Sequence, residues 1–130
     1  MTTTINASPT NGLVQTADGS GVLKVQSNGV TTNALAWVNF NGTGTVAIRS
    51  SYNVSSITDN GTGDYTVNFT TALADANYAV TGWSQAAALN QPYLSTIVSV
   101  TTNAIRSTYT TYTAGAYADP SVVCISVHGN

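Results

Sequence analysis

The sequence contains no glutamate, a single cysteine, a single histidine and very few charged residues of either sign. Lysine and arginine number 3 and aspartate 5, so charged residues make up 6% of the chain, against about 25% in ordinary globular domains. The net charge of -2 and the isoelectric point near 4.7 exclude the basic surface that nucleic acids and anionic membranes require. The lone Cys124 excludes an intrachain disulfide and a cysteine-based zinc site.

Long hydrophobic segments are also missing from this chain of 130 residues, whose length fits one domain. No stretch approaches the roughly 20 apolar residues that span a bilayer, so we expect no membrane insertion. The first twenty residues lack the basic and apolar regions of a secretory signal peptide, so we expect no signal peptide and synthesis in the cytoplasm.

Residue types that perform catalysis are scarce, and their spacing is unfavourable. Cys124 and His128 share one face of an expected strand but lie roughly 13 Å apart at ~3.3 Å per residue, too far for a Cys–His pair. Aspartates at turns typically bond the backbone, so an acid–base pair of Asp59 and Asp64 is the weaker interpretation. The loop of residues 59–64 offers oxygen ligands but does not match the spacing of an EF-hand calcium site. Three copies of His128 or Asp119 could hold a metal only if they met on a symmetry axis. We therefore expect no enzymatic activity, no metal and no cofactor.

Uncharged polar residues take the place of the charged ones. Threonine, serine and asparagine make up more than a third of the chain. A surface with so little charge lacks the electrostatic repulsion that keeps proteins apart. This composition favours a chain that packs against copies of itself or against a larger assembly. An ordinary soluble β domain of unusual composition is the alternative, and composition alone does not decide between them.

The hydrophobic pattern predicts strands along most of the chain. Tyr65, Val67 and Phe69 alternate with polar residues, which is the period of a strand with one buried face. About eight such segments follow one another at roughly 8- to 12-residue spacing, as in a sandwich or barrel. Turn pairs such as Asn41-Gly42 lie between them and favour hairpins. We predict an all-β fold, an antiparallel β-sandwich that is jelly-roll-like with about eight strands.

The first quarter of the chain differs from the rest. Residues 1–33 contain no aromatic residue, and every aromatic residue lies between Trp37 and Tyr117. Because each aromatic side chain buries about 150–250 Å², a segment without them builds no core of its own. We therefore predict an extended N-terminal arm over residues 1–33, which serves attachment or assembly, and a β-sandwich domain over residues 34–130.

The aromatic residues are the best candidates for binding. Four lie on apolar faces and are most simply core residues: Trp37, Tyr65, Phe69 and Tyr78. The segment around Trp37, residues 35–40, is apolar on both faces, so we expect it to be covered on both sides. Four others lie among small and polar residues and are candidates for contact with a glycan or a partner: Trp83, Tyr93, Tyr109 and Tyr112. Exposed tyrosine and tryptophan suit such contacts, although packing between subunits is the simpler interpretation.

The last expected strand, residues 121–128, supplies candidates for a subunit interface. Its apolar residues on one face are Val123, Ile125 and Val127, and Val122 and Cys124 lie on the other face. We expect one face to pack inside the sandwich and the other to pack against neighbouring copies of the chain.

Two consecutive segments have a distinctive sequence: AWVNFNGTGTVAIR over residues 36–49 and YNVSSITDNGTGDYTVNF over residues 52–69. They resemble a domain of tailed-bacteriophage virion proteins, found at the C-terminus of tail fibres and in related short structural proteins, including those of phages of cyanobacteria. The resemblance is close over residues 36–80 and looser over the rest of the β domain. It implies a homotrimeric, β-rich protein of the virion and brings no catalytic motif.

The short arm narrows the expected role within a virion. Even fully extended, residues 1–33 span about 110 Å at ~3.3 Å per residue, less than a long receptor-binding fibre requires. We therefore expect a capsid decoration (cement) protein or a short fibre on the virion surface. Its partners would be copies of the chain and a major capsid or tail protein, with no nucleic acid. The alternative is a tail-fibre tip that binds a host-surface receptor or glycan.

Overall fold

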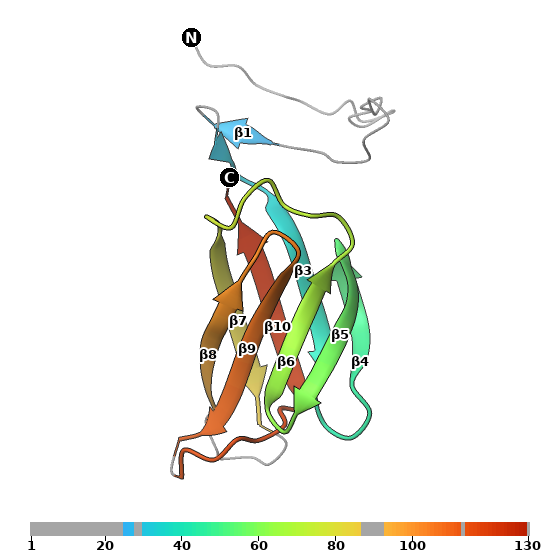
Figure 1. Ribbon diagram of the computed structural model, residues 1–130, viewed down its shortest axis with the longest axis vertical. Coiled ribbons are helices and arrows are strands. Elements are labelled where there is room, and N and C mark those ends of the chain that lie inside the picture. Colours follow the sequence, from blue (N-terminus) through green and yellow to red (C-terminus); the bar gives the residue numbers. More distant parts are fainter. Residues whose placement is uncertain (1–24, 28–29, 87–92, 113, 130) are drawn as a thin grey trace, which may run out of the picture.

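The computed structural model describes residues 25–27, 30–86, 93–112 and 114–129, and within these ranges the chain forms strands and connections without a helix (Figure 1). The strands are β1 (Gln26–Ser27), β2 (Val30–Thr31), β3 (Ala34–Asn41), β4 (Ala47–Tyr52), β5 (Val54–Gly61), β6 (Asp64–Phe69), β7 (Ala79–Gln85), β8 (Tyr93–Val100), β9 (Ala104–Thr111) and β10 (Val122–His128). No helix in this described part is long and apolar enough to cross a membrane.

Strands β3 to β10 form two antiparallel sheets that face each other (Figure 1). The β3 sheet has the order β4-β3-β10-β7, and the β6 sheet has the order β5-β6-β9-β8. The prediction of an all-β antiparallel sandwich is confirmed. Three connections are hairpins within one sheet, namely β3–β4, β5–β6 and β8–β9.

The core lies between the two sheets and follows from alternation along the strands. In β6, Tyr65, Val67 and Phe69 are buried while the residues between them are only partly covered, as the sequence predicts. Phe40 of the β3 sheet packs edge to face on Tyr65 of the β6 sheet, with ring centroids 5.3 Å apart. Each fully buried apolar side chain contributes about 1.5–3 kcal/mol to folding, so this double layer is the main source of stability.

A polar cluster ties the connection before β10 to the sandwich. One carboxylate oxygen of Asp119 accepts hydrogen bonds from the Tyr65 hydroxyl and the Gly63 amide, both at 2.7 Å. Gly63 has a φ of 64°, and an added Cβ would lie 2.5 Å from the carbonyl oxygen of Tyr109, so only glycine fits here. Burial, followed by the hydrogen bond to Asp119, raises the pKa of Tyr65 well above its ordinary value. Asp119 therefore has a structural role.

Asn53 forms the corner where the chain passes from β4 in one sheet to β5 in the other. Its φ of 55° is a conformation that asparagine tolerates better than most residues. The side-chain oxygen accepts a hydrogen bond from the Thr71 amide at 2.8 Å, and the side-chain nitrogen donates to the carbonyl oxygens of Leu35 and Thr71, both at 3.1 Å. This side chain thereby joins three segments that are distant in sequence.

The segment before the sandwich contains one short pair of strands. β1 and β2 are antiparallel, with Gln26 opposite Thr31, and belong to neither large sheet. The sandwich begins with β3 at Ala34. Most of the predicted arm, residues 1–24, lies outside the described residues, so the arm stays a prediction.

Two sequence predictions for the first long strand are wrong. Ala36, Val38 and Phe40 of β3 are buried, but Trp37 between them is 38% exposed on the outer face. The strand is therefore covered on one side, and Trp37 is not a core residue. In a sandwich of two layers each strand has only one face toward the partner sheet, whatever residues the other face carries.

Candidate functional site

The aromatic residues predicted to bind a ligand do not form one site. Trp83 of β7 is exposed on the β3 sheet. Tyr93, at the start of β8, is partly buried and pairs with Thr111, the residue before the exposed Tyr112. Tyr93 and Tyr112 therefore lie at the same end of the β8–β9 hairpin, in the sheet opposite to that of Trp83.

Tyr109 is a core residue, so its prediction as a surface contact is wrong. It is 2% exposed and shares the inner face of β9 with Ile105 and Ser107. Its hydroxyl lies within hydrogen-bond distance of the Ser107 hydroxyl, at 3.1 Å, and burial raises its pKa. The polar neighbours that suggested exposure lie on the opposite face of the strand, which alternation allows.

The residues predicted to form a subunit interface are also core residues. Val123, Ile125 and Val127 are 0%, 4% and 1% exposed. The prediction is wrong for this face, because β10 lies between β3 and β7 in the interior of its sheet and turns these side chains toward the other sheet. The alternate face, with Val122 and Cys124, is only partly covered.

The outer face of the β3 sheet carries an aromatic pair that the sequence analysis missed. Trp37 of β3 is the cross-strand partner of Tyr52 of β4, and both are exposed. Direct partners of this kind place their Cβ atoms about 4.5–5.5 Å apart on the same face. Trp83 lies on this face too, because its β10 partner is Cys124, which alternates with buried residues. We call Trp37, Tyr52 and Trp83 the aromatic face.

One sequence signal would have placed Trp37 on the surface. The residues of β3 on its face include Asn39, whereas those on the other face are all apolar. Asn39 accepts a hydrogen bond from Arg49 at 3.3 Å and donates to the Cys124 sulfur at 3.3 Å. Arg49 also donates to the carbonyl oxygen of Ser121 at 2.7 Å. Polar side chains therefore lie beside the aromatic face and are held by bonds within the sheet.

The lone histidine also has a neighbour on the outer face of β10. The Nε2 atom of His128 lies 2.8 Å from the hydroxyl oxygen of Ser126. Cys124 contacts Asn39 instead. Within the described residues, no group of three His, Cys, Asp or Glu side chains is arranged to hold a metal ion.

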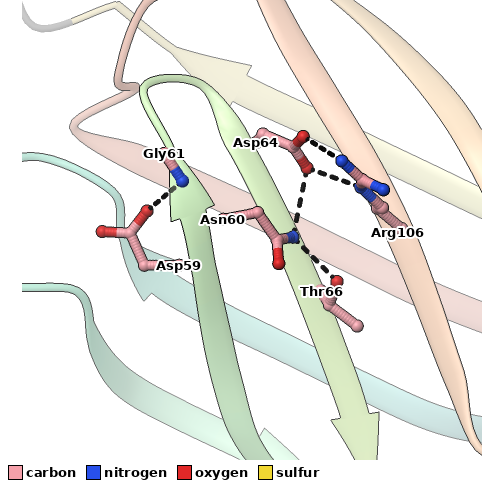
Figure 2. Close-up of polar contacts among 6 residues, drawn as sticks. All are labelled: Asp59, Asn60, Gly61, Asp64, Thr66 and Arg106. Atoms are coloured by element: carbon pink, nitrogen blue, oxygen red, sulfur yellow. Dashed lines mark hydrogen bonds and ion pairs between the residues drawn. The ribbon is translucent and has the colours of Figure 1, made fainter.

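An ion pair lies on the outer face of the β6 sheet (Figure 2). Arg106 of β9 donates through Nε at 2.9 Å and through Nη2 at 2.6 Å to the two carboxylate oxygens of Asp64. Asn60 donates to Asp64 at 3.2 Å and to the Thr66 hydroxyl at 2.9 Å. The hydrogen bond from Arg106 lowers the pKa of Asp64, and Asp64 in turn raises the pKa of Arg106. This cluster fastens β5, β6 and β9 together.

The second aspartate near this turn bonds the backbone. Asp59 accepts a hydrogen bond from the amide of Gly61 at 2.9 Å, as Figure 2 shows. Asp59 and Asp64 thus have different partners, Asp59 within the β5–β6 turn and Asp64 on β9. Asp59 thus shows the local turn bonding that the sequence favours, whereas the main partner of Asp64 is Arg106 of β9 rather than the turn backbone.

Among the described strands, β8, an edge strand of the β6 sheet, carries the most exposed aliphatic residues. Four of its aliphatic residues are 37% to 53% exposed: Leu94, Ile97, Val98 and Val100. We call these four residues the aliphatic edge. Neither β8 nor β7, the edge strand of the β3 sheet, contains a charged residue.

No protein-family model, curated protein or solved structure matches this chain.

Proposed function

We propose that this chain is a non-enzymatic structural protein of a bacteriophage virion and that it functions as a homotrimer. In this proposal the N-terminal arm, residues 1–33, attaches the trimer to a major capsid or tail protein, and the β-sandwich projects from the virion surface. The protein would act as a capsid decoration (cement) protein or as a short fibre. The phage origin and the trimer are implied by the resemblance of residues 36–80 to tail-fibre domains.

The observation that carries the proposal is a surface with many exposed apolar side chains and very few charges. Eleven large hydrophobic side chains are exposed in the described part of the chain, which exceeds the number of charged residues in the whole sequence. Proteins that act alone in solution keep larger apolar patches covered and rely on charge to stay apart. Interfaces, in contrast, are enriched in aromatic residues and depleted of lysine and glutamate. A permanent place in an assembly explains both the exposed apolar residues and the missing charge.

Absolute mass in solution tests the trimer. Light scattering on the purified full chain should give three times the chain mass of 13.4 kDa. Immunogold labelling of particles of the phage that encodes the chain should then place the protein on the virion surface. A chain that remains monomeric at high micromolar concentration would contradict the trimer, and unlabelled particles would contradict the virion assignment.

A second candidate function, a fibre tip that binds a host-surface glycan, is favoured by the aromatic face. Trp37, Tyr52 and Trp83 share one sheet face with hydroxyl and amide groups, and aromatic rings beside such groups suit a sugar ring. In this case, replacing Trp37 and Tyr52 by alanine should weaken binding of the protein to host cells. Tyr117→Ala is the matched control, because Tyr117 is even more exposed than Trp37 and Tyr52 but lies outside the three residues of the aromatic face. Equal cell binding by all variants would exclude this function.

A further inference from the structure

We propose that the aliphatic edge, Leu94, Ile97, Val98 and Val100 of β8, is the surface through which copies of this chain contact one another. The inference rests on the proposed homotrimer and adds the location of its interface. It replaces the interface on β10, whose apolar residues are used inside the sandwich.

The aliphatic side chains of β8 are exposed on both faces of the strand. Leu94 pairs with Thr110 and lies on the outer face of the sheet. Ile97 pairs with the buried Ser107, so it points toward the space between the two sheets, yet it is 44% exposed. A residue on the inner side of a sandwich is normally covered by the partner sheet. The described residues of this chain therefore do not complete the sandwich at β8.

β7, the edge strand of the other sheet, also has an exposed residue on its inner side. Figure 1 shows β7 behind β8 on the same side of the sandwich. Gly82 of β7 pairs with the buried Ile125 and so lies on the inner side of its sheet, but it too is exposed. Among the described residues, Ile97 and Gly82 are thus both inner-side residues that stay exposed where β7 and β8 lie opposite each other. Apolar side chains from another chain would complete the core there and remove Ile97 from water.

Edge strands of proteins that act alone carry features that prevent pairing, and β8 has few of them. Lysine, proline and inward-pointing charges are the usual protections. The sequence YLSTIVSV of β8 contains none of these residues, and its one irregularity is a bulge between Ile97 and Ser99. An eight-residue strand of this kind offers both unpaired backbone groups and aliphatic side chains to a neighbour.

A second copy of the chain is the occupant that fits this surface. In a trimer, equivalent residues of the three copies meet where they lie close to the threefold axis, so a charged edge placed there would repel its own copies. β7 and β8 are free of charge, and no such repulsion arises. The exposed residues of β8 are four aliphatic residues and three with small hydroxyl side chains, and none is charged. A composition of this kind is typical of the permanently buried centre of a homomeric interface. Three copies arranged with β8 toward a common axis would bury every aliphatic edge.

Single lysine substitutions on the full chain test this location. Leu94→Lys and Ile97→Lys introduce a charge where the proposal buries an apolar side chain, and each position is exposed enough in the monomer for the fold to persist. Self-association should weaken at least tenfold, so that light scattering reports one chain where the unsubstituted protein has three. Ser50→Lys is the matched control, because Ser50 is exposed on β4, which lies in the other sheet at the edge opposite to β7, and this variant should stay trimeric.

The possible outcomes separate this inference from the proposed function. A monomeric unsubstituted protein overturns both. A trimer that persists in Leu94→Lys and Ile97→Lys overturns the location alone. Should these variants fail to fold, hydrogen exchange on the unsubstituted protein decides: amides along β8 should exchange slowly at concentrations where the trimer forms and faster on dilution. Exchange along β8 that does not depend on concentration overturns the location.

Discussion

The buried hydroxyl of Tyr65 offers the sharpest test of the packing in this structure. Tyr65→Phe removes the hydroxyl that donates to Asp119 at 2.7 Å and leaves the ring, so no cavity of consequence forms. A hydrogen bond to a charged group contributes about 1.5–3 kcal/mol. The carboxylate of Asp119 keeps its second bond, from the Gly63 amide, so we expect a loss of about 2 kcal/mol in the free energy of unfolding. For a sandwich of this size that corresponds to a melting temperature lower by roughly 8 °C.

Tyr109→Phe is the control for this measurement. Tyr109 is equally well buried, but its hydroxyl meets the neutral Ser107 hydroxyl at 3.1 Å, so its removal should cost only about 1 kcal/mol. Urea denaturation at one fixed protein concentration compares the variants, because self-association would otherwise shift the transition. The reasoning fails if Tyr65→Phe lies within about 0.5 kcal/mol of the unsubstituted protein, as surface substitutions do, or if Tyr109→Phe costs more.

Three further predictions concern glycine, acid and alkali. Gly63→Ala should lower the free energy of unfolding by more than about 3 kcal/mol, because the added Cβ would meet the carbonyl oxygen of Tyr109. Gly44 has nearly the same φ but open space around it, so Gly44→Ala should lose only the backbone strain of about 1–2 kcal/mol. Similar urea midpoints for the two variants would contradict this reasoning. Asp64→Asn should destabilise the protein at neutral pH, and because the folded-state pKa of Asp64 is lowered, the difference should disappear in urea titrations as the pH falls below 3.8. Burial raises the pKa values of Tyr65, Tyr78 and Tyr109 above the ordinary value of 10. Because the unfolded chain then releases these protons first, the free energy of unfolding should fall above pH 10 by about 1.4 kcal/mol per pH unit for each tyrosine. Tyrosinate absorbance should therefore rise together with unfolding rather than before it.

Local patterns in the sequence were sufficient for the strands and turns. The alternation of Tyr65, Val67 and Phe69 identified β6 and its buried face, and the Asp59 turn was assigned to backbone bonding. Both depend on residues within a few positions of one another, where the two-residue period of a strand and the preferences of turn residues act directly. The class of the fold follows from such local signals repeated along the chain.

Contacts between residues distant in sequence, such as the polar cluster of Asp119, Tyr65 and Gly63, could not be predicted from local patterns. Asp119 meets Tyr65 and Gly63 across more than fifty positions of sequence, so nothing near Asp119 indicates its partners. Asn53 likewise joins segments that the chain brings together only at the corner between the sheets. These contacts depend on which strands pair, and pairing is a property of the whole chain.

Which apolar strand is exposed was likewise decided by the tertiary structure, because exposure depends on which strands pair. The segments of β8 and β10 are both short, apolar and free of acidic residues, and by sequence alone either is a plausible interface. β10 pairs on both sides, with β3 and β7, and turns Val123, Ile125 and Val127 into the core, while β8 pairs on one side only and leaves Ile97 exposed. The sequence determined that these segments are strands. Their position in the sheet order, set by pairing between distant segments, determined which one is buried and which one stays exposed at an edge.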